Sequence, residues 1–158
     1  QCDWSSDVCS SDLLFIESEI SSQQHELKNN YETTEKLLVS FKNNLEKFGQ
    51  FINKNVSDAD LVYVFGGNSS SQILLKNFLK NKNIICILDN AKIKESKCLY
   101  GFNYVVKKPD VIKNESNEKA IVLIFTGTYV DEIKKQIRDI NQNIRTLTMS
   151  DFKNELLD

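Results

Sequence analysis

The fold of this chain is decided by one stretch, Leu61-Val62-Tyr63-Val64-Phe65-Gly66-Gly67-Asn68-Ser69-Ser70. Its first five residues form a continuous apolar run, which is typical of a strand buried on both faces of a parallel sheet. The two glycines permit a tight turn, and the polar residues that follow favour the start of a helix. We therefore expect a strand, a turn and a helix in that order.

Two more apolar runs, at residues 84–88 and 121–125, end in polar residues in the same way. Shorter extended segments lie at residues 104–106 and 144–148, and helical patterns separate most of these strands. Strands that alternate with helices imply right-handed crossovers and a mostly parallel sheet. We expect an α/β fold with a Rossmann-like sheet of about four to five strands, flanked by helices, in which residues 61–65 lie between 84–88 and 121–125.

Three local signals predict where helices begin. Pro109 has the favoured first position of a brief helix. Thr128 with Asp131, and Thr148 with Asp151, have the three-residue spacing of a capping box. We expect helices to start at these points, the last of them being a terminal helix.

The residues before this α/β pattern, from 14 to 53, are helical by their spacing. One apolar stripe recurs at alternating steps of four and three residues, as in a heptad repeat. It comprises Leu27, Tyr31, Thr34, Leu38, Phe41, Leu45, Phe48 and Ile52. We expect a long amphipathic helix, or two helices broken near Gly49, packed on the following domain; the alternative is a coiled-coil seam between two copies. The expected organisation is a helical segment at 14–57 and a Rossmann-like domain at 58–158.

Residues 1–13 have no helical or strand periodicity and hold the only Trp of the chain. Residues 3–13 resemble the translation of a common sequencing-adapter oligonucleotide, so we expect residues 1–13 to be a disordered artefact outside the fold. Residue 14 is then an arbitrary starting point, and the natural protein is expected to be longer. Without Asp3, Asp7 and Asp12 the acidic count falls from 22 to 19 against 20 basic residues, which leaves a net charge of +1.

This composition excludes several classes of partner. A near-neutral charge offers no basic surplus for nucleic acid. The longest apolar run, residues 120–125, is far shorter than the roughly 20 residues of a membrane span. Beyond residue 13, no cysteine forms a CxxC motif or has a neighbouring histidine, which disfavours zinc. We expect a cytoplasmic protein with no nucleic-acid partner, no membrane partner and no metal site in this chain.

A ligand site is expected at the carboxyl ends of the strands, because ligands collect there where the strand order reverses. Backbone N–H groups at a helix start favour an anion such as phosphate, and Asp89 has the position of a ribose-binding acid. The third glycine of G-x-G-x-x-G and the P-loop lysine are absent. The alternative is that the glycines only permit a turn. The candidate substrate-binding residues are Gly66, Gly67, Asn68, Ser69, Ser70, Asp89, Asn90, Thr126 and Tyr129.

Groups for acid–base or nucleophilic catalysis are scarce. The only histidine, His25, lies in the N-terminal helical segment, far in sequence from both loops. No Ser-His-Asp set, Cys-His pair or metal-ligand cluster can be assembled. We therefore name no catalytic residue.

Five short motifs follow one another from residue 60 onward. They are Val62-Tyr63-Val64-Phe65-Gly66-Gly67, Ile87-Leu88-Asp89-Asn90 followed by Lys94, Leu99-Tyr100-Gly101, Pro109, and Tyr129-Val130-Asp131-Glu132-Ile133. In this order they resemble the C-terminal domain of bacterial sugar C-methyltransferases that use S-adenosylmethionine, including relatives encoded with capsule or surface-polysaccharide genes. The similarity spans about residues 35–148, and its specificity lies in the order and spacing of the motifs.

The resemblance carries expectations about function. Members of this family place a cysteine-rich zinc segment and an S-adenosylmethionine-binding domain before a Rossmann-like domain of this kind. The resemblance implies that this domain holds the nucleotide-sugar substrate. Gly66, Gly67, Asn68, Asp89, Asn90 and Gly101 would line the nucleotide-facing edge. S-adenosylmethionine and zinc are expected in a missing N-terminal part, so this fragment alone is expected to be inactive. Residues 68–71 depart from a run that is usually richer in Ala or Gly.

Two other functions stay open. The nucleotide-sugar-binding domain of a sugar acyltransferase has a small Rossmann-like unit too, but hexapeptide repeats should follow it, and residues 151–158 have a helical pattern instead. A non-enzymatic module would dimerise through the stripe at residues 27–52. An independent NAD-dependent enzyme is disfavoured by the incomplete glycine fingerprint.

Overall fold

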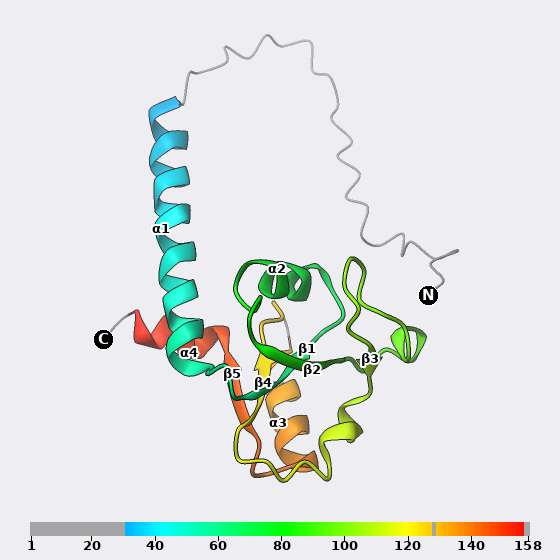
Figure 1. The fold of residues 1–158 in the computed structure, drawn as a ribbon. Helices are drawn as coiled ribbons and strands as arrows, with labels where there is room; N and C mark the ends of the chain where they lie inside the picture. The colour runs from blue at the N-terminus through cyan, green and yellow to red at the C-terminus, as the bar shows by residue number, and fades with distance from the viewer. Residues whose placement is uncertain (1–30, 128, 157–158) are drawn as a thin grey trace. The chain divides into compact units, whose positions relative to one another are not determined.

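The computed structural model describes residues 31–127 and 129–156 (Figure 1). Within these ranges the helices are α1 (Tyr31–Asn55), α2 (Ser69–Asn77), α3 (Val130–Ile140) and α4 (Met149–Glu155), with two 3-10 helices, η2 (Lys92–Lys94) and η3 (Pro109–Ile112). The strands are β1 (Leu61–Phe65), β2 (Asn83–Leu88), β3 (Val106–Lys107), β4 (Ala120–Ile124) and β5 (Arg145–Thr148).

The described strands form a five-stranded sheet in the order β3-β2-β1-β4-β5. Every neighbouring pair is parallel. The predicted α/β class and the Rossmann-like parallel sheet are therefore confirmed, as is the position of residues 61–65 between the two other long apolar runs. The short extended segment predicted at 104–106 contributes the edge strand β3.

The central strand β1 sends alternate side chains to the two faces of the sheet. Val62 and Val64 are fully buried and join one cluster with Leu75 of α2 and Phe152 of α4. Tyr63 and Phe65 join a second cluster with residues of η3 and α3. Figure 1 shows α2 and α3 on opposite faces of the sheet. Because both faces are covered here, the central strands β1 and β4 need apolar residues at every position, which explains their unbroken apolar runs.

The described part of the chain divides into two units between residues 43 and 44, within α1. The second half of α1 belongs to the second unit, where Phe48, Phe51 and Ile52 are buried in the core. The ring of Phe48 lies edge-on to three other rings, at centroid distances of 4.9 Å to Phe78, 5.2 Å to Phe125 and 5.1 Å to Phe152.

Helix α1 is continuous through Gly49, so of the two arrangements expected for this segment the single long helix is the one observed over residues 31–55. The rest of the predicted helical segment, residues 14–30, lies outside the described residues. Although α1 has 25 residues, no helix in the described part of the chain is apolar enough over sufficient length to cross a membrane.

Two of the three predicted helix starts are confirmed. The Thr148 side chain accepts from the backbone N–H of Asp151, whose carboxylate accepts in return from the N–H of Thr148, which makes a capping box at α4. Pro109 takes the first turn of η3. Helix α3 begins after Tyr129, its N-cap residue. The capping box predicted for Thr128 involves a residue outside the described ranges.

Candidate ligand-binding site at the carboxyl edge of the sheet

The glycine turn after β1 is fastened to the end of β2. The N–H of Gly66 donates to the carbonyl of Leu88 at 2.7 Å, and the buried hydroxyl of Ser71 donates to the carbonyl of Gly66. Gly66 has a φ of +102°, and a Cβ there would lie 2.9 Å from Asn68 Nδ2 and 3.1 Å from Thr126 Cγ2. Both the backbone and the available space therefore require glycine at this position.

The start of α2 is capped from within the turn. Asn68 is the N-cap residue, and its Oδ1 accepts from the backbone N–H of Ser71 at 3.1 Å. Ser69 and Ser70 form the exposed first turn of the helix. The first N–H groups of a helix have no partner within the helix and carry the positive end of its dipole. This end of α2 therefore favours an anion near Ser69 and Ser70.

Asp89, directly after β2, is the most constrained side chain at this edge. Its Oδ2 accepts from the N–H of Gly67 at 2.7 Å and from Lys94 Nζ at 3.2 Å, and its Oδ1 accepts from the N–H of Ala91 at 2.8 Å. The Asp89 side chain is only 12% exposed. A carboxylate offers about four lone-pair positions, so these three bonds leave one, on Oδ1.

This arrangement changes the expected role of Gly67. In a dinucleotide fingerprint the second glycine lets the backbone approach a pyrophosphate. Here the N–H of Gly67 is already bonded to the Asp89 carboxylate, and a Cβ on Gly67 would lie 3.3 Å from Asp89 Oδ2. A phosphate beside Gly67 would meet a fixed negative charge. Beside Gly67, this turn is therefore better suited to a hydroxyl group, which can donate a hydrogen bond to Asp89, than to a phosphate.

Asn90 is used differently from its neighbour. Its side-chain amide exchanges two hydrogen bonds with the amide of Gln136 in α3, at 2.9 Å and 3.0 Å. This pairing joins the end of β2 to α3. Among the candidate residues, Asn90 therefore has a structural role that the sequence did not indicate, and Gln136, 46 positions away, gave no local signal of it.

Gly101 lies at the third position of a turn between η2 and β3. The N–H of Phe102 donates to the carbonyl of Leu99 at 2.9 Å, and the φ of Gly101 is +78°. A Cβ at Gly101 would have no heavy atom within 4 Å. The turn conformation accounts for this glycine without a ligand.

The loop after β4 reaches the glycine turn through Thr126, whose methyl group faces Gly66. Tyr129, the N-cap residue of α3, has a left-handed backbone with φ +59° and a side chain that is 72% exposed. The contacts at this edge thus bring together five of the candidate residues. These are Gly66, Gly67, Asn68, Asp89 and Thr126.

Lys94 also lies at this edge, although it was not among the candidate residues. It lies five positions after Asp89 and forms an ion pair with it at 3.2 Å, and its own side chain is 42% exposed. Its spacing from Asp89 was part of the family motif quoted above, so the signal was present. The pattern alone did not reveal that the Lys94 ammonium donates a hydrogen bond to the Asp89 carboxylate.

Tyr63 is a structural residue rather than a ligand contact. Its buried hydroxyl donates to Glu115 Oε2 at 2.7 Å, which ties the loop after η3 to the sheet. Burial raises the pKa of Tyr63 well above its ordinary value, and the hydrogen bond to Glu115 raises it further. The same hydrogen bond lowers the pKa of Glu115. Burial also raises the pKa of the Cys86 thiol, which disfavours the nucleophilic thiolate.

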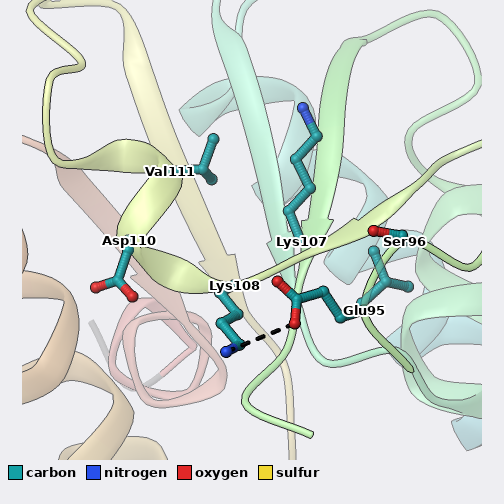
Figure 2. A pocket seen from close by; sticks show the side chains of 7 residues that line it. Glu95, Ser96, Lys107, Lys108, Asp110 and Val111 are labelled. Atoms are coloured by element: carbon teal, nitrogen blue, oxygen red, sulfur yellow. Dashed lines mark ion pairs between the residues drawn. The ribbon is translucent and has the colours of Figure 1, made fainter. Parts of the chain in front are cut away.

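A shallow cavity of about 400 Å³ lies beside the edge strand β3 and η3. It is lined by Glu95, Ser96, Val106, Lys107, Lys108, Asp110 and Val111. Lys108 Nζ lies 3.5 Å from Glu95 Oε2 and forms an ion pair with it. Figure 2 shows these two side chains pointing toward one another, while Lys107 extends in another direction. Since its charges are balanced and do not converge, this cavity gives no clear indication of a ligand.

Within residues 31–127 and 129–156 no group of three His, Cys, Asp or Glu side chains could hold a metal ion. Comparison with known proteins adds no further guidance: no family model matches the chain, and no match was found among curated proteins or solved structures.

Proposed function

We propose that the α/β unit binds the nucleotide-linked sugar substrate of a sugar C-methyltransferase that uses S-adenosylmethionine. The observation that carries this proposal is the Asp89 carboxylate, which three donors hold at the carboxyl edge of the sheet beside the glycine turn. The family resemblance supports the same assignment, because it gives the C-terminal domain the task of holding the nucleotide sugar.

The hydrogen bonds of Asp89 favour a sugar or ribose hydroxyl as its partner. The free lone pair on Oδ1 can accept one hydrogen bond. A hydroxyl donates such a bond, whereas a phosphate oxygen at neutral pH would be repelled. Hydrogen bonds to a charged acceptor contribute about 1.5–3 kcal/mol, more than those between neutral groups. Asp89 would therefore discriminate in favour of a ligand that carries a hydroxyl at this point.

The phosphates of the same ligand would lie farther along the turn, at the first turn of α2. Ser69 and Ser70 are exposed there and offer hydroxyl groups in addition to the helix dipole. A nucleotide or a nucleotide-linked sugar carries both the hydroxyl that suits Asp89 and the phosphate that suits Ser69 and Ser70. A free sugar or inorganic phosphate would satisfy only one of the two positions.

The methyl transfer itself is assigned to another part of such an enzyme. S-adenosylmethionine and zinc would be held by the N-terminal domains of the family, and zinc has no three-ligand group among the described residues. In this proposal the present domain contributes substrate binding and orientation, and no residue described above acts on the methyl group.

The test is a calorimetric titration of the whole chain with UDP-glucose and with dTDP-glucose. The informative variant is Ser70→Asp, which places a negative charge at the second position of α2. The helix dipole stabilises a negative charge at this position, so we expect the fold to be retained. The same charge repels a bound phosphate. We expect binding of the nucleotide sugar to weaken about tenfold or more.

A matched control exists in the same chain. Ser150 is an exposed serine at the second position of α4, and Ser150→Asp makes the same change at another helix start. This variant should bind as the wild type does. The proposal is wrong if neither nucleotide sugar binds at millimolar concentration, or if the two aspartate variants bind equally well.

A second function, self-association through α1, is favoured by a separate observation. Leu37, Leu38, Val39 and Phe41 are all more than half exposed on this helix. Large apolar side chains gathered on one short segment mark an interaction surface more often than isolated ones do. We propose that this segment binds a second copy of the chain.

A further inference from the structure

The exposed apolar side chains of α1 have the spacing that a partner helix requires. Thr34, Leu38, Phe41 and Leu45 follow one another at steps of four, three and four residues, which is the heptad pattern of helices that pair in a coiled coil. Leu38 and Phe41 are 63% and 61% exposed, and Leu45 is 38% exposed. The next residue of the series, Phe48, is buried in the core of the α/β unit, so the exposed part of the stripe ends at Leu45.

We propose that two copies pair through this stripe in an antiparallel arrangement, with Leu38 of one copy against the partner's Phe41. The inference rests on the self-association proposed above and adds its direction and register. A two-fold axis relates the copies, so the contact of Leu38 with Phe41 occurs twice. Leu37, which is 66% exposed, lies beside this pair and extends the apolar surface.

Charge complementarity selects this register. Glu35 precedes the apolar pair and Lys42 follows it, both on the same flank of the stripe. With Leu38 opposite the partner's Phe41, Glu35 of each copy lies next to the partner's Lys42, so two opposite-charge pairs form. Neither side chain makes an ion pair within the described residues of its own chain.

Other registers bring like charges together. Moving the helices by one heptad in one direction places Glu35 next to the partner's Glu35. Moving them by one heptad in the other direction places Lys42 next to the partner's Lys42. In a parallel pair in register, the residue that faces Lys42 is the partner's Leu37, and no opposite-charge pair forms. Of these four arrangements, the antiparallel register with Leu38 against Phe41 is the one in which Glu35 and Lys42 both lie next to an opposite charge.

The test is sedimentation of the whole chain at concentrations up to about 1 mM. Such high concentrations are needed because an interface made by a few side chains of one helix is small and therefore weak. The variants are Glu35→Lys, Lys42→Glu and the two together. Each single change replaces both attractive pairs by repulsive ones, and we expect the dissociation constant of the dimer to rise about tenfold. The double variant should dimerise as the wild type does.

Mixing the two single variants gives a sharper outcome. One then carries lysine and the other glutamate at both positions, so a mixed dimer should form more readily than either variant forms with itself. Lys36→Glu changes a charge on the opposite side of the helix and serves as the control, with no effect expected. Circular dichroism confirms that each variant keeps its helices.

The possible outcomes distinguish self-association from the antiparallel register proposed for it. A wild-type chain that stays monomeric at every concentration overturns self-association and this inference with it. A wild-type dimer that responds to Glu35→Lys no more than to Lys36→Glu overturns the antiparallel register and leaves self-association standing. Neither result bears on nucleotide-sugar binding, which uses the carboxyl edge of the sheet.

Discussion

Replacing Gly66 by alanine should destabilise the chain through two separate effects. The first is the backbone, because an L-residue with φ near +102° is strained by about 1–2 kcal/mol. The second is the new methyl group, which would lie 2.9 Å from Asn68 Nδ2. Asn68 cannot move away without giving up its cap bond to Ser71, and an N-cap contributes about 1 kcal/mol. Together we expect a loss of about 2–3 kcal/mol in the free energy of unfolding.

Gly101→Ala is the matched control, since Gly101 also has a positive φ but its missing Cβ would meet no atom within 4 Å. It should cost only the backbone strain, about 1–2 kcal/mol. Urea unfolding followed by circular dichroism gives both values. In an Asn68→Ala background the cost of Gly66→Ala should fall by about 1 kcal/mol, because the cap has already been lost. Equal costs at the two glycines, or strict additivity with Asn68→Ala, would refute this reasoning.

Two further predictions concern a buried and an exposed phenylalanine of α1, and the pH dependence of stability. Phe48→Ala should cost about 3–5 kcal/mol because it removes a buried ring with several aromatic contacts, whereas Phe41→Ala, at an exposed position of the same helix, should cost under about 0.5 kcal/mol when measured on the monomer. In the folded chain the pKa of Glu115 is below its ordinary value of 4.5, because the Tyr63 hydroxyl donates to its carboxylate. The ionised Glu115 therefore stabilises the folded state above pH 4.5, and this stabilisation is lost as the pH falls through the folded pKa. Tyr63→Phe should remove this contribution. The difference in unfolding free energy between wild type and variant should therefore shrink as the pH falls from about 6 to about 3, a range that brackets the ordinary glutamate pKa. A difference that stays constant over this range would show that Glu115 is not responsible.

The sheet could be predicted from the sequence because its signals are local. The unbroken apolar runs of β1 and β4 require burial on both faces, and the spacing of Thr148 and Asp151 fixes the start of α4. The apolar stripe of α1 was also visible. Its period continues from Phe41 to Phe48, however, and a period does not reveal that the first is exposed and the second buried.

The candidate site was predicted only in part, because its decisive contacts join distant segments. A glycine turn and an acid after the next strand fit either a bound nucleotide or an internal hydrogen bond. The bond from Gly67 to Asp89 spans 22 positions, and the pairing of Asn90 with Gln136 spans 46. Nothing in the sequence near Asn90 distinguishes a ligand contact from a link to α3. Gly101 posed the same ambiguity, and its turn resolves it in favour of the backbone.

The most direct test of the central claim is to map the ligand onto the chain by backbone amide NMR during a titration with UDP-glucose. The proposal predicts that the largest shifts occur at Gly67, Ser69 and Ser70 and at Ala91, whose N–H shares the Asp89 carboxylate. It also predicts that inorganic pyrophosphate shifts the two serine amides but leaves Ala91 unchanged, because the Asp89 carboxylate repels this anion and pyrophosphate carries no sugar hydroxyl. Shifts centred elsewhere on the sheet, or no saturable shifts at the glycine turn, would contradict a nucleotide-sugar site at this edge.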